Sequence, residues 1–252
     1  MGTALITGAS AGLGEEFAWQ LATVRHNLVL VSRDAERLEQ VAGKLRAAAG
    51  VRVEVLPADL SKERDLGRVA SRLKASARPV GLLVNNAGFG IRQSFVDASL
   101  KDLAAMEKVM IHAVMTLSHA AAGAMVKRGR GAILNVSSIA AYLAGGIYAA
   151  DKAWVKTFTE GLAVELKGTG VTATTLLPGL TRTEFHARAG LDYLSYPSVA
   201  WLSAADVVAK GLADVRRGAV LSTPSWRYAA IGQIARLLPR FIVRALSLVE
   251  DR

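Results

Sequence analysis

The architecture of this chain follows from one stretch near its start, Thr7-Gly8-Ala9-Ser10-Ala11-Gly12-Leu13-Gly14. The stretch comes after a short apolar run and opens a longer amphipathic run. Small residues in such a turn let backbone N–H groups approach a pyrophosphate, and the N-terminus of the following helix adds partial positive charge. We therefore predict that Gly8, Ser10, Gly12, Leu13 and Gly14 bind a dinucleotide. A tight strand-to-helix turn without a ligand is the alternative.

Short apolar runs and amphipathic runs alternate along the rest of the chain. Strands are expected at 3–7, 28–32, 51–56, 80–85, 132–137, 171–177 and 219–223, and helices at 13–24, 34–49, 62–77, 98–129, 147–168 and 203–217. Nearly continuous apolar strands are typical of a parallel sheet that is buried on both faces. The pattern predicts an α/β protein with a Rossmann-like doubly wound parallel sheet of about seven strands and helices on both faces. A β/α barrel is the alternative, but the glycine-rich turn favours the open sheet.

The composition excludes several classes of protein. The 252 residues include no cysteine, which excludes disulfides, zinc–thiolate sites, iron–sulfur clusters and thiol nucleophiles. Four scattered histidines offer no ligand spacing, so we expect no metal. The net charge of +10 arises from 31 basic and 21 acidic residues that are dispersed along the chain. No reading helix or basic–aromatic platform for nucleic acid is evident.

Residues 1–252 are expected to form a single dinucleotide-binding and catalytic domain, since no repeat, linker or composition break interrupts them. The absence of a signal-peptide core and of an uninterrupted membrane-spanning run favours a cytoplasmic protein, and the apolar run that comes closest is 229–249. Residues 180–201 concentrate aromatic side chains and are predicted to form a substrate lid, with a pair of surface helices as the alternative. Residues 224–252 form a basic amphipathic extension. It either contacts a membrane surface or packs on the domain or on a second subunit of a homo-oligomer.

The end of the second predicted strand indicates which dinucleotide is bound. An acidic residue at this position would read a ribose 2′-hydroxyl, whereas an arginine accommodates a 2′-phosphate. Here the strand ends at Ser32-Arg33, and Arg37 follows one helical turn later. A guanidinium pairs with phosphate in a bidentate geometry, so Ser32, Arg33 and Arg37 predict NADP (NADPH) rather than NAD. The alternative is that Arg33 lies at a solvated start of a helix.

Four further motifs follow the later strands. They are Asn85-Asn86-Ala87-Gly88, Asn135-Val136-Ser137-Ser138, Tyr148-Ala149-Ala150-Asp151-Lys152 and Pro178-Gly179-Leu180-Thr181-Arg182-Thr183. Together with the glycine-rich turn, they make residues 3–223 resemble the short-chain dehydrogenase/reductase family. The resemblance implies an NADP(H)-dependent oxidoreductase that transfers a hydride between the nicotinamide and a carbonyl or alcohol substrate.

The resemblance also assigns roles to single residues. It implies that Ser138, Tyr148 and Lys152 are catalytic and that Lys152, beside Tyr148, also holds the nicotinamide ribose. It places Asp59 near the adenine, Asn85 near the adenosine half and Thr183 near the carboxamide. The remaining motif residues that it assigns to the cofactor are Ala87, Gly88, Pro178, Gly179 and Thr181.

The Tyr148 and Lys152 pair makes chemical sense by itself. The two residues are four positions apart and share one face of a helix. A free tyrosine has a pKa near 10, so it is a poor base at neutral pH. We expect the Lys152 ammonium and an oxidised nicotinamide to lower the pKa of Tyr148 by about three units, which requires roughly 4 kcal/mol. Tyr148 would then exchange a proton with the substrate oxygen, to which Ser138 donates a hydrogen bond.

The sequence departs from the family in three places. Met110 occupies the position of an asparagine that binds a relay water next to the lysine, and methionine has no amide to replace it. Ser138 and Tyr148 are ten residues apart, about three fewer than usual. Asp151 replaces a serine, and we expect its side chain to point away from Lys152. These departures keep open a catalytically decayed nucleotide-binding module. Where the chemistry is intact, the apolar segments around the site favour a hydrophobic substrate.

Overall fold

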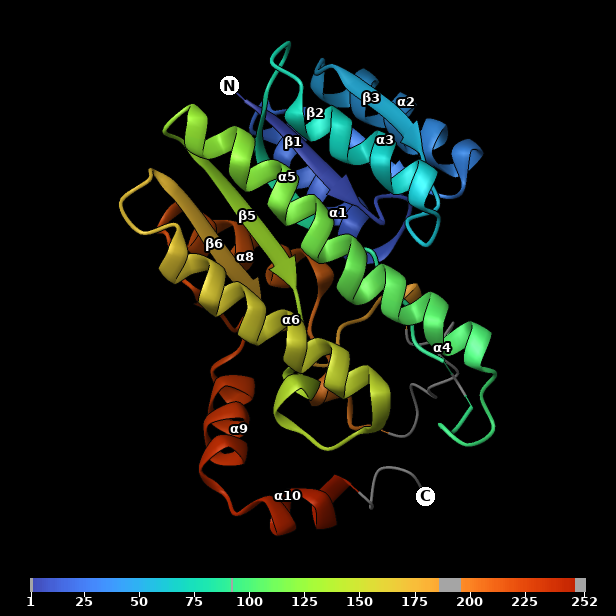
Figure 1. The fold of residues 1–252 in the computed structure, drawn as a ribbon, viewed down its shortest axis with the longest axis vertical. Helices are drawn as coiled ribbons and strands as arrows, with labels where there is room; N and C mark the ends of the chain where they lie inside the picture. Colours follow the sequence, from blue (N-terminus) through green and yellow to red (C-terminus); the bar gives the residue numbers. More distant parts are fainter. Residues whose placement is uncertain (1, 92, 186–195, 248–252) are drawn as a thin grey trace.

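A single parallel sheet forms the centre of the computed structural model, which describes residues 2–91, 93–185 and 196–247 (Figure 1). Its strands are β1 Thr3–Thr7, β2 Asn27–Ser32, β3 Val53–Pro57, β4 Val80–Asn85, β5 Gly131–Val136, β6 Val171–Leu176 and β7 Leu221–Ser222. Their order across the sheet is β3-β2-β1-β4-β5-β6-β7, and every neighbouring pair is parallel. The open, doubly wound sheet is therefore confirmed, and the barrel is excluded.

Helices cover both faces of this sheet. They are α1 Gly12–Thr23, α2 Ala35–Ala49, α3 Glu63–Lys74, α4 Leu100–Glu107, α5 Ala113–Lys127, α6 Gly146–Glu165, α8 Ala204–Arg216, α9 Trp226–Leu237 and α10 Arg240–Ser247. One apolar core joins α1, α2 and α8 to the sheet, and a second core joins α3, α5 and α6 to the opposite face. The strands lack polar alternation because both of their faces are buried in these cores.

The order of the strands reverses direction between β1 and β4. The chain moves outward from β1 to β3 and then returns to the other side of β1. In open α/β sheets, ligands bind in the crevice beyond the carboxyl ends of the strands at such a reversal. The glycine-rich turn after β1 and the Asn85-Asn86-Ala87-Gly88 motif after β4 therefore meet at this position.

Two elements differ from the sequence prediction. The helix expected at 98–129 is divided by a π-helical turn, Lys108–His112, between α4 and α5. This long segment, Leu100–Lys127, is also the described stretch that meets the length and hydropathy of a membrane span, although half of its most apolar window is buried in the fold. The expectation that the run at 229–249 comes closest to a membrane span is therefore wrong. Pro239 divides it into α9 and α10, because proline cannot continue a helix.

The predicted substrate lid lies only partly within the described residues, since 186–195 fall outside them. The described ends of this segment are held together. Thr181 and Leu202 form an isolated parallel bridge. The Tyr228 hydroxyl of α9 accepts a hydrogen bond from the Leu180 N–H (3.3 Å) and donates one to the Ala200 carbonyl (2.8 Å). The C-terminal extension thus contacts both ends of the segment.

Candidate active site

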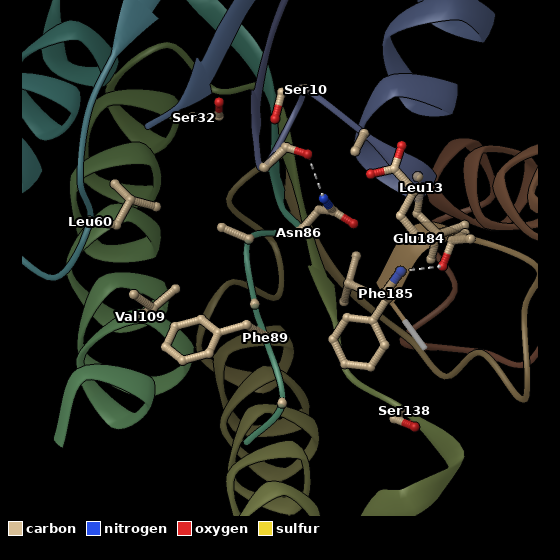
Figure 2. A pocket seen from close by; sticks show the side chains of 18 of the residues that line it. Ser10, Leu13, Ser32, Leu60, Asn86, Phe89, Val109, Ser138, Glu184 and Phe185 are labelled. Carbon is tan, nitrogen blue, oxygen red and sulfur yellow. Dashed lines mark hydrogen bonds between the residues drawn. The ribbon is translucent and has the colours of Figure 1, made fainter. Parts of the chain in front are cut away.

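A cleft of about 510 Å³ opens beyond the carboxyl ends of the strands (Figure 2). Its volume lies in the range of small-molecule sites. The sequence-predicted residues that line it are Gly8, Ser10, Gly12, Leu13, Ser32, Arg33, Asp59, Ala87, Gly88, Ser138, Tyr148, Lys152, Pro178, Gly179, Thr181 and Thr183. Three predicted residues, Gly14, Arg37 and Asn85, are not part of the lining. The fold thus brings most of the predicted site together from motifs that are distant in the sequence.

The glycine-rich turn has the features of a phosphate-binding loop. Gly8 and Gly12 adopt φ values of +67° and +56°, which favour glycine. Ala11 caps α1 without any side-chain hydrogen bond, so the first N–H groups of the helix have no side chain to satisfy them. Gly14 acts by packing, since a Cβ there would lie 2.1 Å from the Gly8 oxygen. The turn therefore fits a dinucleotide pyrophosphate, and its N–H groups would hold it.

The two asparagines after β4 have different roles. Asn85 is buried and donates hydrogen bonds to the Ser118 hydroxyl (3.1 Å) and to the Asn135 side-chain oxygen (2.9 Å). It therefore supports the floor of the cleft from below. Asn86, which the sequence analysis did not single out, lines the cleft and donates to the Thr7 carbonyl (3.0 Å) and to the Gly8 carbonyl (3.4 Å). Figure 2 shows the Asn86 side chain in the cleft. A polar side chain directly after a buried strand end was the available signal.

Arg33 and Ser32 line the end of the cleft at which the sequence analysis expects the adenosine half of the cofactor, and we call this the adenosine end. No carboxylate takes the place of Arg33. Asp34, the nearest acid in sequence, caps α2 by accepting the Arg37 N–H (2.9 Å). Arg37 itself forms a bidentate ion pair with Glu184, which follows β6 and lines the cleft. This pair raises the pKa of Arg37, chiefly through its hydrogen bonds. This end of the cleft thus has Arg33 in its lining, while Arg37 lies outside the lining and is paired with Glu184.

Asp59 lies near Arg33 in the same part of the cleft. Burial acts to raise the pKa of its carboxyl, but hydrogen bonds from the Ser61 hydroxyl (2.7 Å) and N–H (3.1 Å) outweigh this effect. The positive charge of Arg33 adds to them, so the pKa of Asp59 is lowered. Asp59 is therefore ionised at neutral pH and accepts hydrogen bonds only.

Ser138, Tyr148 and Lys152 converge at the other end of the cleft. Ser138 caps a 3₁₀ turn, Ile139–Tyr142, by accepting the Ala140 N–H (3.1 Å). The turn lets the short loop after β5 bring Ser138 to α6, where its side chain hydrogen-bonds Tyr148. Lys152 lies one helical turn beyond Tyr148, with its Nζ 5.7 Å from the centre of the phenol ring and 2.9 Å from the Val136 carbonyl.

The pKa values at this end differ from the sequence expectation. Burial raises the pKa of Tyr148 to about 12, and the hydrogen bond with Ser138 offsets only part of the rise. The expectation that Lys152 lowers the pKa of Tyr148 is therefore wrong for the protein alone. Burial also lowers the pKa of Lys152 to about 8, against a smaller raising effect of the Asp151 charge. At neutral pH Tyr148 is a protonated phenol, and Lys152 is still mostly charged.

Met110 lies beside Lys152, as the resemblance to the family implied. Its Sδ and the Lys152 Nζ are both 3.6 Å from the position that a Cβ on Gly88 would occupy. Met110 is buried and belongs to the π-helical turn. Its thioether is a weak acceptor, so the ammonium gains little from it. His112 instead contacts Glu63 on the surface (3.3 Å) and does not replace the missing amide.

Asp151 is the largest departure from the sequence expectation. Its side chain is buried, and among the described residues its Oδ2 has no hydrogen-bond partner. Burial and the nearby Glu107 carboxylate raise its pKa to about 6, while the Lys152 charge lowers it by less. The expectation that Asp151 points away was wrong. Side chains of adjacent residues in a helix point in different directions, but those of Asp151 and Lys152 both lie in the interior, between α6 and the π-helical turn.

Aromatic and apolar side chains surround the catalytic end of the cleft. Phe89 and Val109 lie on one side and Phe185 on the other, with Ser138 near Phe185 (Figure 2). The Phe185 ring is tilted against Tyr148, with 5.8 Å between the ring centres. The described residues contain no group of three metal-ligating side chains. The site therefore offers hydroxyl, phenol and ammonium groups in an apolar setting.

Comparisons with known proteins identify the family of this chain. The short chain dehydrogenase family matches residues 2–193. Sulfoacetaldehyde reductase 2 of Chromohalobacter salexigens is 36% identical over 186 residues, which cover 72% of this chain and 73% of the relative. A short-chain dehydrogenase of Sphingobium yanoikuyae, solved in complex with NADPH, has a TM-score of 0.86 and 35% identity over 94% of each chain. A bulky-bulky ketone specific alcohol dehydrogenase of Comamonas testosteroni has a TM-score of 0.82 and 30% identity over 94% of this chain and 92% of its own.

The chain belongs to the short-chain dehydrogenase/reductase family. It is an NAD(P)-dependent oxidoreductase that acts on alcohol or carbonyl groups. The comparisons give no support to a decayed nucleotide-binding module. The fold and the activity inferred from the five motifs are thus confirmed.

Proposed function

We propose that the protein is an NADPH-dependent reductase of hydrophobic ketones or aldehydes, or the corresponding alcohol dehydrogenase. The observation that carries the proposal is the convergence of Ser138, Tyr148 and Lys152 at one end of a cleft whose other end holds Ser32 and Arg33. A nicotinamide dinucleotide is long enough to connect an arginine-lined end with a phenol-lined end. The glycine-rich turn lies between the two ends.

The preference for NADPH over NADH rests on the charges after β2. Arg33 offers a guanidinium where a 2′-phosphate would lie, and Asp34 cannot read a ribose hydroxyl freely because it caps α2. Arg37 becomes available to the phosphate only if its pair with Glu184 opens. We therefore assign the principal phosphate contact to Arg33, supported by Ser32, and a secondary role to Arg37.

The proposed chemistry assigns one task to each side chain. The bound dinucleotide supplies or accepts the hydride. Tyr148, protonated at neutral pH, gives its proton to the carbonyl oxygen during reduction. Ser138 Oγ accepts the Ala140 N–H, so its one hydrogen, which serves the hydrogen bond with Tyr148, can turn to the same oxygen when substrate is bound. Lys152 keeps positive charge beside the phenol as the proton leaves, and its hydrogen bond to Val136 fixes its position.

The substrate class follows from the lining near Tyr148. Phe89, Val109 and Phe185 present rings and methyl groups, and within the described residues no charged side chain but Lys152 lines this end. Such a site favours a bulky apolar carbonyl over a charged one, because an ionised group would lose hydration there without a partner. The ketone specificity in the name of the Comamonas testosteroni structure is consistent with this proposal.

We further propose a cytoplasmic homo-oligomer. The absence of cysteine suits a reducing compartment. Met115 and Val126 of α5 and Val164 of α6 are exposed on helices that cover the same face of the sheet (Figure 1). Burial of these side chains against a second copy would favour association. Light scattering of the purified protein tests the assembly, and a monomer at micromolar concentration would exclude it.

A cofactor-oxidation screen tests the proposed function. Purified protein is mixed with NADPH or NADH and with a panel of ketones and aldehydes that range from charged sugars to bulky aryl ketones. We expect turnover with NADPH and bulky apolar carbonyls, and weaker turnover with NADH. Equal rates with both cofactors would contradict the role of Arg33. Turnover restricted to charged substrates would contradict the apolar substrate class.

A further inference from the structure

The helices α9 and α10 present an apolar surface that is not covered by the rest of the described chain. They lie beyond the carboxyl ends of β5 and β6, on the side of the molecule where the cleft opens (Figure 1). Five large hydrophobic side chains of this segment are exposed. We call this surface the C-terminal patch, and it consists of Trp226, Ile231, Ile234, Leu237 and Phe241. Trp226 is 80% exposed and Leu237 is 82% exposed, although burial of either would be favourable.

The inward face of α9 is already occupied. Gly232 and Ala235 are buried, and a Cβ on Gly232 would lie 3.0 Å from the Tyr142 ring. The Tyr228 ring lies so close to Gly179 that a Cβ there would be 2.2 Å away. The patch is therefore a second apolar face on a helix that is already docked, and folding of the described chain does not bury it.

The charged residues of α9 and α10 are all arginines. Residues 224–249 contain four arginines, Arg227, Arg236, Arg240 and Arg244, and no lysine, aspartate or glutamate. At 100° per residue, Trp226, Leu237 and Ile234 share one side of α9, with Arg236 at one edge and Arg227 between Ile234 and Ile231. A surface that combines apolar side chains with arginines is typical of helices that lie in a membrane interface, and tryptophan is enriched at that depth.

A second copy of the chain fits this surface poorly. In a two-fold contact the patch would meet itself, so the four arginines of one copy would face those of the other without an acidic residue in α9 or α10 to pair with them. The patch needs partners for its arginines and an apolar environment for its exposed side chains. An anionic bilayer supplies both, since its headgroups pair with arginine and its acyl region accepts tryptophan, leucine and phenylalanine. The charge complementarity therefore selects the bilayer.

We propose that the C-terminal patch docks the protein on an anionic lipid surface, with Trp226, Leu237 and Phe241 in the interface and the arginines at the headgroups. This contact is peripheral, because α9 (12 residues) and α10 (8 residues) are separate helices, and each is too short to span a bilayer. It goes beyond the proposed reductase activity and does not depend on it. Its consequence is that the mouth of the cleft lies near a phase in which apolar carbonyls dissolve.

Vesicle flotation of the full-length protein tests the proposal. The probes are vesicles of pure phosphatidylcholine and vesicles that also contain phosphatidylserine. We expect binding to the mixed vesicles, little binding to the neutral ones, and a decrease of binding as salt is raised. Equal binding to both vesicles, or to neither, would overturn the proposal. A dimer that dissociates when the patch is altered would assign the surface to a second copy instead.

Two sets of variants separate the apolar and charged contributions. The triple variant Trp226→Ser, Leu237→Ser, Phe241→Ser should reduce the partition coefficient by at least about 100-fold. The double variant Arg227→Gln, Arg236→Gln should reduce it by about 30-fold, from about 5-fold for each arginine. Matched controls are Val24→Ser, an exposed valine after α1, and Lys44→Gln with Arg64→Gln, two exposed charges on α2 and α3.

The control variants should bind vesicles as the unaltered protein does. If they lose binding as strongly as the patch variants, general charge and apolarity would explain adsorption, and the patch would not. Turnover of a water-soluble ketone in vesicle-free buffer should be the same for all variants, because none of the substituted residues lines the cleft. Failure of the docking proposal is thereby distinguishable from failure of the proposed activity.

Discussion

The two ends of the cleft handle charge in opposite ways. At the adenosine end, Arg33 and the Arg37–Glu184 pair are accessible to solvent, and water screens them. At the catalytic end, Lys152 and Asp151 are buried, and their pKa values move toward neutrality. Exposed charges can select a ligand by its phosphate. Buried charges exchange protons near neutral pH, which is what acid–base chemistry requires.

The largest expected effect is on turnover, when the phenol hydroxyl of Tyr148 is removed from the catalytic end of the cleft. Tyr148→Phe removes the proton donor and keeps the ring, so kcat should fall about 10³-fold while the Kd for NADPH changes less than about 2-fold. Stopped-flow turnover and fluorescence titration measure the two quantities. Tyr142→Phe is the matched control, because Tyr142 lies outside the cleft lining and contacts Lys156. Near-native turnover of Tyr148→Phe would refute the role of Tyr148.

The next effect belongs to the adenosine end. Arg33→Ala removes the guanidinium proposed to bind the 2′-phosphate, so the Kd for NADPH should rise about 10- to 100-fold while that for NADH stays nearly constant. Isothermal titration with both cofactors gives the comparison. Lys44→Ala, an exposed cation of α2 that does not line the cleft, should leave both affinities unchanged. A parallel loss of NADH affinity would indicate a structural role for Arg33.

A smaller effect is expected from the buried carboxylate. The folded-state pKa of Asp151 is about 6, above its unfolded value, so at pH 7.5 the carboxyl is ionised in both states and the folded state bears the cost of burying its charge. Asp151→Asn should therefore raise the free energy of unfolding at pH 7.5 by about 1 kcal/mol. The gain should shrink as pH falls through 6 and vanish near pH 4. Urea unfolding across this range measures it.

The same variant should change the pH profile of reduction. Asp151 raises the pKa of Lys152, which is about 8, so its removal lowers that pKa further. The decline of kcat/KM above about pH 8 should then begin at lower pH in Asp151→Asn. An unchanged profile, together with increased stability, would restrict Asp151 to a structural role.

The smallest effect concerns the ion pair across the adenosine end. Glu184→Gln should free Arg37 for the 2′-phosphate and increase NADPH affinity by about 2- to 5-fold, the range of an exposed pair. NADH affinity should not change. The double variant Arg37→Ala, Glu184→Gln should lose the gain, and persistence of the gain would show that Arg37 is not its source.

The sequence predicted the strands and the location of the cleft more reliably than the burial and the pKa values of the side chains. The strands were placed within about two residues because their apolar runs and the turns between them are local signals. The motifs located the cleft, since parallel strands bring their carboxyl ends to one edge. Asn85 was misjudged, because only the folded structure distinguishes a side chain that lines a cleft from one that supports it from below.

The electrostatics could not be read from spacing. The spacing of four positions from Tyr148 to Lys152 predicts a shared helix face, but the desolvation of each side chain depends on everything packed around that face. The burial that lowers the pKa of Lys152 also raises the pKa of Tyr148, so the two shifts have a common cause. The burial of Asp151 likewise arises from contact between α6 and the π-helical turn, which is an interruption of a helix that the hydrophobic pattern does not reveal.

The Tyr228 hydroxyl connects the C-terminal extension to the rim of the active site through Leu180 and Ala200. A displacement of α9 must therefore perturb both anchor points of the intervening chain together. Thermodynamic linkage makes this relation reciprocal, so a molecule seated in the cleft that rearranges either anchor also changes the energy of moving α9. If a tag fused after residue 252 displaces α9, it changes the positions of Leu180 and Ala200, and the kinetic constants of tagged and untagged protein then differ.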